Sequence, residues 1–306
     1  MIVSIIIRTF NEERYLARLL DAVADQRMAE DSDTSQAGPM DVEVVLVDSG
    51  STDRSVEIAR ARGAVICHLA PEAFSFGRSL NLGCSRATGE IFVFVSGHCI
   101  PKTRTWLRAL IEPIRAGDAV LSYGRQVAGE TTSLSEAEVF SRLYPDRSAV
   151  PQDGFFCNNA NAAVSRPVWE RFGFDEELTG LEDMHLGKRI VESGGRIAYV
   201  AEAAVAHYHH ETWAHIRRRY EREAIALRRI RPEWHVTLSD FLRYVAVGVL
   251  LDSAIAVRQR RWLRNAPHIV MFRLMQYWGS YRGNYAHRQL AEKEKRAYFY
   301  PIRRDS

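Results

Sequence analysis

Two short turns carry residues whose types and spacing suit ligand binding: Thr9, Asn11 and Glu12 in the first, and Asp48 and Ser49 in the second. Each turn follows an apolar run, over residues 2–7 and 43–47. A carboxylate that leaves a buried strand, before a Gly/Ser turn and a new helix, makes a polar pocket for a ligand. Asn11 is also placed to cap the helix that follows it. Because Asp, Asn and Ser favour turns and caps in general, each turn taken alone fits a structural role equally well.

Amide side chains gather in a third segment, residues 155–162, where Asn159 and Asn161 stand between apolar flanks. Buried amides need hydrogen-bond partners. We therefore expect these two to line a site for a ligand rich in hydroxyl groups, as sugars and their acceptors are. A turn followed by the start of a strand is the alternative.

Carboxylates and imidazoles form two further groups. Glu182 and Asp183 begin an expected helix over 182–193. Acidic residues stabilise any helix N-terminus, so a purely structural role in this helix is the alternative to a catalytic one. His207 and His209 follow an expected strand, where alternate spacing points both imidazoles to one face. Shared metal ligation requires that arrangement, although it also occurs without a metal.

The elements that must position these residues are indicated by four apolar runs, over 2–7, 43–47, 64–68 and 91–95. Between the runs, apolar residues recur at spacings of three and four, which is typical of helices. Near-continuous apolar strands that alternate with helices predict an α/β, Rossmann-like fold with a mostly parallel sheet covered on both faces. In such a sheet ligands bind beyond the carboxyl ends of the strands, where the polar turns lie.

The strand signals stop near residue 210, and helical patterns follow over 213–227 and 241–257, with Pro232 and Pro267 interrupting this part of the chain. We therefore predict one domain over 1–210 and a helical C-terminal region over 211–306. Residues 28–41 are acidic, polar and unpatterned, which predicts a flexible surface insertion.

Charge and cysteine content narrow the partners. A net charge of +3 is too small to indicate nucleic-acid binding, and we expect none. Arginines cluster over 215–231 and 258–264, which suits diphosphates or lipid headgroups, although a solvated helix face also explains each cluster. The four cysteines include no CxxC, and the N-terminus lacks a signal-peptide pattern, so we expect a reduced, cytoplasmic protein with buried thiols. No apolar run reaches the roughly 18–20 residues of a transmembrane helix.

Together the turns resemble those of the family-2 glycosyltransferases, which have the GT-A fold. The family opens with a strand that runs into Thr-x-Asn-Glu, as at 9–12, followed by Val-Asp-x-Gly-Ser-x-Asp, as at 47–53, and a Gly-x-x-x-Asn-x-Gly helix, as at 77–83. The resemblance extends from residue 2 to about residue 230. It implies a set of residues that bind a nucleotide sugar: Thr9, Asn11, Glu12, Asp48, Ser49, Arg78, Ser96 and His98.

The chain departs from the family after the run 91–95. The family places an Asp-x-Asp there, which holds a divalent cation on the donor diphosphate, and this chain has Ser96-Gly97-His98. Three readings stay open. His98 ligates Mn²⁺ or Mg²⁺ with His207 or His209; or arginines neutralise the leaving group without a metal; or the donor is a sugar nucleoside monophosphate, such as a CMP-sugar.

The acceptor side of the family is also recognisable. Residues 174–183 resemble its Gly-Phe-Asp-Glu loop and the Glu-Asp that follows at a helix start. The resemblance implies that Asp183 is the general base that deprotonates the acceptor hydroxyl, with Glu182 supporting it. Some processive relatives carry Gln-x-x-Arg-Trp further along, and this chain has Arg217-Arg218-Arg219-Tyr220-Glu221-Arg222 instead, which argues against processive synthesis.

We therefore predict an inverting glycosyltransferase that adds a sugar to a glycan or lipid-linked acceptor in cell-envelope polysaccharide synthesis. A degenerate nucleotide-sugar-binding or scaffold protein is the alternative favoured by the missing Asp-x-Asp. A sugar-nucleotidyltransferase is a third reading, opposed by the lack of a Gly-rich basic loop after the first strand. We expect the cytoplasmic face of the membrane as the location, with peripheral contact through residues 241–264; packing of these helices on the catalytic domain or in a homodimer is the alternative.

Overall fold

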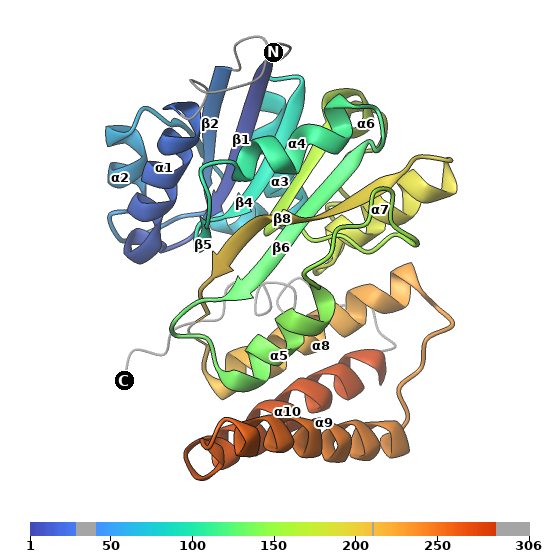
Figure 1. Ribbon diagram of the computed structural model, residues 1–306. Coiled ribbons are helices and arrows are strands. Elements are labelled where there is room, and N and C mark those ends of the chain that lie inside the picture. Colours follow the sequence, from blue (N-terminus) through green and yellow to red (C-terminus); the bar gives the residue numbers. More distant parts are fainter. Residues whose placement is uncertain (29–40, 210, 286–306) are drawn as a thin grey trace. The chain divides into compact units, whose positions relative to one another are not determined.

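The computed structural model describes residues 1–28, 41–209 and 211–285 and divides them into two compact units (Figure 1). The first unit comprises 1–129, 143–177 and 182–208, and the second comprises 130–142, 178–181 and the chain from 209 onward. The second unit thus includes two short segments that precede residue 210 in the chain. The expected insertion over 28–41 lies outside the described residues, apart from its two ends.

The first unit is built on an eight-stranded sheet in the order β3-β2-β1-β4-β7-β6-β8-β5. Its strands are β1 (Ile2–Thr9), β2 (Asp41–Asp48), β3 (Val65–His68), β4 (Ile91–Ser96), β5 (Cys99–Pro101), β6 (Leu121–Ala128), β7 (Asn161–Ser165) and β8 (Ile197–His207). The half made of β3, β2, β1 and β4 is parallel, and β6 runs parallel to β8. The remaining pairs are antiparallel. The four predicted strands and the parallel arrangement that joins them are confirmed.

Helices cover both faces of this sheet, which explains why its strands are apolar throughout. They are α1 (Glu13–Met28), α2 (Ser55–Ala61), α3 (Phe76–Arg86), α4 (Trp106–Arg115), α6 (Arg166–Phe172) and α7 (Glu182–Glu192), with a short 3-10 helix at Pro71–Ala73. The main core gathers apolar side chains of α1 and α4 against β1, β2 and β4. On β1 the alternate residues Ile5 and Ile7 face that core, whereas Ile6 faces α3, where Gly83 leaves no room for a Cβ.

The second unit is helical and contains α5 (Leu134–Leu143, of which the last residue belongs to the first unit), α8 (Trp213–Ile230), α9 (Leu238–Arg258) and α10 (Trp262–Tyr285). The predictions of helices over 213–227 and 241–257 are confirmed as α8 and α9. Pro267 does not interrupt the third helix, because α10 begins five residues before it and continues through it.

Close helix packing at glycines and a buried ion pair stabilise the second unit. Gly279 and Gly283 bring α10 so close to α8 that a Cβ at either position would lie within 2.3 Å of a backbone oxygen of α8. The Arg273 guanidinium of α10 binds the Asp252 carboxylate of α9 through two bonds of 2.7 and 2.8 Å, and both side chains are at most 2% exposed. Within the part of the chain that the structure describes, none of the helices has the length and apolarity needed to cross a bilayer.

Candidate active site

Strand pairing brings the predicted donor-site residues of the first unit to one edge of the sheet. Thr9 at the end of β1 pairs in register with Asp48 at the end of β2, and Arg8 pairs with Ser96 at the end of β4. Because β1, β2 and β4 are parallel, their carboxyl ends meet at the same edge. Three motifs that lie almost ninety residues apart in the sequence therefore form one site.

The loops after β1 and β2 are tied together by Asn11. Its side-chain Oδ1 accepts hydrogen bonds from the backbone N–H groups of Thr52 at 2.8 Å and Asp53 at 3.3 Å. In return the Asn11 N–H donates to the hydroxyl of Ser51 over 3.0 Å. Asn11 has a φ of +57°, a conformation that asparagine tolerates better than most residues. The expectation that Asn11 caps the next helix is wrong, because its side chain reaches across to the neighbouring loop.

Asp48 is buried and shapes the loop that follows it. Its two carboxylate oxygens accept hydrogen bonds from the N–H groups of Gly50 at 3.2 Å and Ser51 at 3.1 Å, and His68 Nδ1 lies 3.4 Å from it. A carboxylate has about four acceptor positions, so these contacts leave capacity for a ligand. Beside it, the Thr9 hydroxyl is buried and has no hydrogen-bond partner among the described residues.

His98 follows β4 and is oriented by Glu12. The Glu12 carboxylate lies 2.6 Å from His98 Nδ1. Glycine is required between Ser96 and His98 because a Cβ on Gly97 would lie 2.9 Å from Cγ of Glu12. A carboxylate bound to one ring nitrogen fixes the imidazole and directs the other nitrogen, Nε2, towards a further partner.

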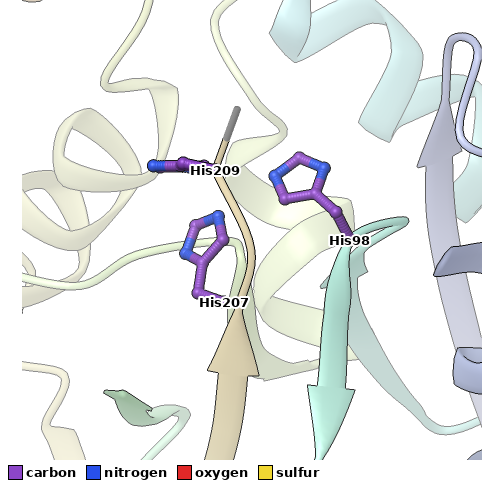
Figure 2. Close-up of side chains that lie close together, drawn as sticks. All are labelled: His98, His207 and His209. Carbon is purple, nitrogen blue, oxygen red and sulfur yellow. The ribbon is translucent and has the colours of Figure 1, made fainter. Parts of the chain in front are cut away.

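His207, at the end of β8, is fixed in the same way by Gln126 of β6. Its Nδ1 lies 2.7 Å from Gln126 Oε1, and Gln126 Nε2 donates to Tyr144 and Asn158. This pattern identifies the Gln126 atom that faces His207 as an acceptor, so Nδ1 carries the proton and Nε2 carries the lone pair. The rings of His98 and His207 stack with their centroids 4.9 Å apart (Figure 2).

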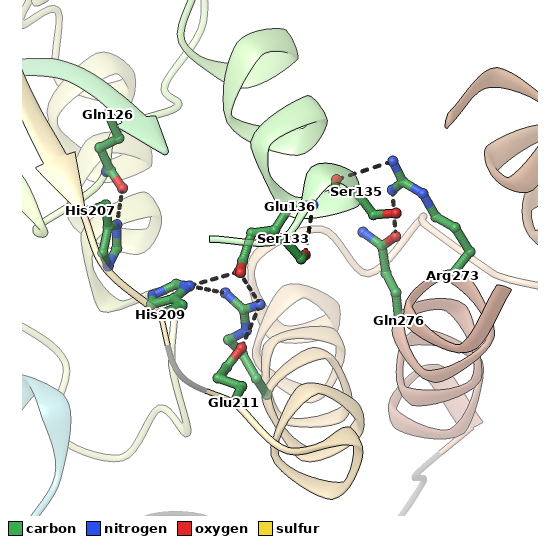
Figure 3. Close-up of polar contacts among 10 residues, drawn as sticks. Gln126, Ser133, Ser135, Glu136, His207, His209, Glu211, Arg273 and Gln276 are labelled. Carbon is green, nitrogen blue, oxygen red and sulfur yellow. Dashed lines mark hydrogen bonds and ion pairs between the residues drawn. The ribbon is translucent and has the colours of Figure 1, made fainter. Parts of the chain in front are cut away.

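His209 belongs to the second unit, where it joins a network of charges (Figure 3). Its Nδ1 lies 2.7 Å from the Glu136 carboxylate of α5. The Arg219 guanidinium binds Glu136 at 2.7 Å and Glu211 at 2.8 Å. Burial raises the pKa of Glu211. Although Glu136, His209 and Glu211 are close enough to share a cation, the guanidinium already neutralises both carboxylates.

The predicted general base lies in the first turn of α7. Asp183 is 7% exposed, and its carboxylate accepts hydrogen bonds from the N–H groups of Asn159 at 2.9 Å and Met184 at 2.7 Å. Burial, aided by the neighbouring Glu182 carboxylate, raises the pKa of Asp183 to about 7. A carboxylate with this pKa accepts a proton far more readily near neutral pH than an ordinary aspartate does.

Arg8 is a residue that the sequence interpretation missed. Its guanidinium lies 3.3 Å from the Glu182 carboxylate and 5.0 Å from the ring centroid of Phe76. Arg8 therefore joins the donor edge of the sheet to the start of α7, where Asp183 lies. Its position in the sequence could have identified it, because a cation at the carboxyl end of a central strand lies at the ligand site of a parallel sheet.

The two predicted acceptor-site amides have different surroundings. Asn159 is 4% exposed, and its Nδ2 has no hydrogen-bond partner among the described residues. The expectation for Asn161 is corrected: it is fully buried, accepts from Trp106 Nε1 at 2.9 Å and donates to the carbonyls of Ala203 and Arg125. With its amide fully bonded inside the sheet, Asn161 holds the fold together.

Arg78 lies at the start of α3 and is bound within the protein. Its Nε donates to Glu176 over 2.7 Å, and its Nη1 donates to the carbonyl of Ala73 over 3.1 Å. About half of the side chain is exposed, so contact with a nucleotide stays a prediction. Ser49 is buried beside Asp48, with its N–H bonded to the carbonyl of Thr9.

Comparisons with known proteins agree with this architecture. The chain is 24% identical to the O-antigen chain rhamnosyltransferase RfbN of Salmonella typhimurium, over 69% of its own length and 68% of the relative's. It is 28% identical to the O-antigen chain rhamnosyltransferase WbaN of Salmonella anatum, over 56% and 58% of the two lengths.

Among solved structures, the mannosyltransferase PcManGT of Pyrobaculum calidifontis, in complex with GDP-Man and Mn²⁺, superposes with a TM-score of 0.63. The match covers 94% of this chain and 88% of that one at 16% identity, and it supports the predicted GT-A fold. The family model of glycosyl transferase family 2 matches residues 4–171, more than half of the 306 residues. The chain therefore belongs to glycosyl transferase family 2.

Proposed function

We propose that this glycosyltransferase transfers a sugar, with inversion, from a nucleotide-sugar donor to a hydroxyl group of a glycan or lipid-linked acceptor, with Asp183 as the general base. The observation that carries the proposal is the environment of Asp183, a buried carboxylate at a helix start whose pKa is raised to about 7. Two buried polar groups support it: the Thr9 hydroxyl on the donor side and the Asn159 amide beside the base.

The donor is assigned to the edge formed by β1, β2 and β4. Thr9, Asp48 and Ser49 line the nucleoside position, and Asn11 holds their two loops in one arrangement. The relatives named O-antigen chain rhamnosyltransferases favour a deoxyhexose donor and an acceptor in envelope polysaccharide synthesis. Ser96 and Arg78 are the further candidates for donor contacts on this side.

The reaction needs one proton acceptor. The acceptor hydroxyl attacks the anomeric carbon from the face opposite the leaving group, and its proton passes to a carboxylate oxygen of Asp183. The bond between the anomeric carbon and the donor phosphate oxygen breaks, and its electron pair leaves with the phosphate. Glu182 supports the base by raising its affinity for a proton, and Arg8 balances the two adjacent carboxylates.

A divalent cation fits the residues that end β4 and β8. His98 and His207 each have Nδ1 anchored, by Glu12 and Gln126, so each presents Nε2 as a ligand. Imidazole binds Mn²⁺, and we assign these two residues as its protein ligands. The cation would supply positive charge to the leaving diphosphate. Neutralisation by arginine, or a sugar nucleoside monophosphate donor, remains the alternative where no cation binds.

The experiment that tests the function measures sugar transfer and nucleotide binding in parallel. UDP-, GDP-, dTDP- and CMP-sugars are offered with envelope glycolipid acceptors to the wild type, to Asp183→Asn and to Glu192→Gln. Glu192 is an exposed carboxylate at the far end of the same helix and serves as the matched control. Loss of a general base reduces turnover by about 10²–10⁴-fold, whereas nucleotide affinity and the control should not change. Nucleotide binding by a wild type that neither transfers nor hydrolyses any donor would favour the binding-protein alternative.

The cation is tested without turnover. Mn²⁺ binding is followed by titration calorimetry for the wild type and for His98→Gln/His207→Gln, with His68→Gln as a control on the exposed β3 edge. Loss of binding in the double variant alone supports the assignment, and unchanged binding overturns it.

A further inference from the structure

The outward side of α9 is unusually apolar for an exposed helix face. We call it the α9 outer face, and it consists of Leu242, Arg243, Ala246, Val247, Leu250, Leu251, Ala254, Val257 and Arg258, all of them exposed. Seven of the nine are apolar, both others are arginines, and none is acidic. The side chains of Leu250 and Val257 are 68% and 59% exposed. A helix on the surface of a globular protein normally turns charged and polar residues outward.

The inward side of the same helix fixes this orientation. Asp252, the one acidic residue between Leu242 and Arg258, is fully buried and bound by Arg273 of α10. Gly248 faces the same arginine, since a Cβ there would lie 2.9 Å from Cδ of Arg273. Turning the outer face inward would break a buried ion pair, so the apolar residues stay outside within this unit.

Basic and aromatic residues continue the surface past the end of α9. Arg258, Arg260, Arg261 and Arg264 are all exposed around the turn into α10. Between them, Leu263 is 86% exposed and Trp262 is 42% exposed. Exposed apolar side chains in the midst of guanidinium groups suit the boundary between lipid headgroups and acyl chains, where tryptophan and arginine both concentrate.

We propose that the α9 outer face and this turn dock the protein on an anionic membrane surface. The charge of the patch favours anionic lipid over a second copy of the chain as the partner. Arg243 is paired with Asp240 of the same helix. In a symmetric dimer the same patch meets itself, so Arg258 and the arginines of the turn would face like charges, with no acidic residue among those that make up the patch. Anionic headgroups supply the missing negative charge, and the apolar residues enter the boundary below them. The inference does not depend on sugar transfer.

Flotation of the full chain with vesicles tests the proposal. The vesicles contain phosphatidylcholine alone or with phosphatidylglycerol, at low and high salt. Two variants remove the apolar and basic components: Leu250→Asp, and Arg258→Gln/Arg261→Gln/Arg264→Gln. Matched controls change exposed residues of the first unit, Val191→Asp on α7 and Arg60→Gln/Arg86→Gln/Arg171→Gln. Nucleotide binding and thermal melting confirm that each variant is folded.

The wild type should float with phosphatidylglycerol vesicles at low salt and much less at high salt. The triple variant should partition about a hundredfold less, since each basic residue near an anionic surface contributes about 1 kcal/mol. Leu250→Asp should also lose binding, and both controls should bind as the wild type does. Absence of flotation on every vesicle overturns the proposal, as does binding that neither variant reduces. A dimer in solution that Leu250→Asp dissociates, without vesicle binding, would assign the face to a second copy of the chain.

Discussion

The backbone N–H of Asn159 donates a 2.9 Å hydrogen bond to Oδ2 of Asp183, while the side-chain Nδ2 of the same asparagine stays without a partner among the described residues. One residue thus fixes the proposed base and offers a donor to whatever lies beside it. A buried, unsatisfied amide costs about 1–3 kcal/mol in the free protein. A ligand hydroxyl at this place removes that cost, which favours the presence of an acceptor or donor sugar next to the base.

The rate of transfer should follow the ionisation of Asp183. A base must be deprotonated, and burial has raised the pKa of this carboxyl to about 7. We therefore expect the turnover number to rise about tenfold per pH unit below the pKa and to level off above it. Steady-state rates at saturating donor, measured between about pH 5 and 9, check this. A flat profile below neutral pH would contradict the assignment.

The same raised pKa should make Asp183 a source of instability at alkaline pH. The folded protein holds the proton of Asp183 more tightly than the unfolded chain does, so the stabilising effect of this proton is complete below about pH 4 and is lost as pH rises through about 7. Asp183→Asn removes this titration. The melting temperature of the variant relative to wild type should therefore increase from pH 4 to pH 8. A difference in melting temperature that stays constant with pH would show that folding does not raise the pKa of Asp183.

Nucleotide affinity should depend on Asp48. Replacing it with alanine removes a buried carboxylate at the donor edge, and a hydrogen bond to a charged group contributes about 1.5–3 kcal/mol. We expect the dissociation constant of the cognate nucleotide to rise roughly 10- to 100-fold. Glu57→Ala is the control, because this exposed carboxylate on α2 pairs only with Arg54 among the described contacts. Equal affinities of the wild type and Asp48→Ala in calorimetry would remove Asp48 from the nucleotide site.

Stability of the second unit should depend on the pairing of Asp252 and Arg273. Asp252→Ala leaves a guanidinium buried without its counter-ion, which costs about 3–5 kcal/mol. The double variant Asp252→Leu/Arg273→Met removes both charges and should recover most of that loss. Urea unfolding followed by circular dichroism separates the two cases. If the double variant is less stable than Asp252→Ala, the pair contributes more than mutual neutralisation.

Sequence patterns predicted the elements well where a strand or helix was strongly apolar. The runs that became β1, β2 and β4 are apolar because helices cover both faces of the sheet, and this signal is local. The α9 helix was equally clear. In the sequence Asp252 interrupts an apolar stretch, although in the structure it is the residue that anchors the helix to α10. A charge looks out of place until its partner, here 21 residues further along, is known.

The sequence predicted which types of residue form the site, but not which of them contact one another. Glu12 and His98 lie 86 residues apart, and Gln126 and His207 lie 81 apart, so no local pattern joins them. Asn159 and Asn161 looked equivalent in sequence. Only the course of β7 separates them, because Asn161 enters the strand and is bonded to Trp106 on the helix that covers it, whereas Asn159 stays at the end of the strand beside Asp183.

The bonds of Asn11 have a practical consequence for exchanging donor specificity between relatives. Its amide oxygen accepts hydrogen bonds from two N–H groups of the second loop. The hydroxyls of Ser51 and Ser55 in turn accept hydrogen bonds from the N–H groups of Asn11 and Glu12. Transplanting either loop alone would leave donors and acceptors facing a foreign partner. Residues 9–13 and 48–55 should therefore be exchanged together. Chimaeras that take the two loops from different relatives should fold poorly, whichever donor sugar those relatives use.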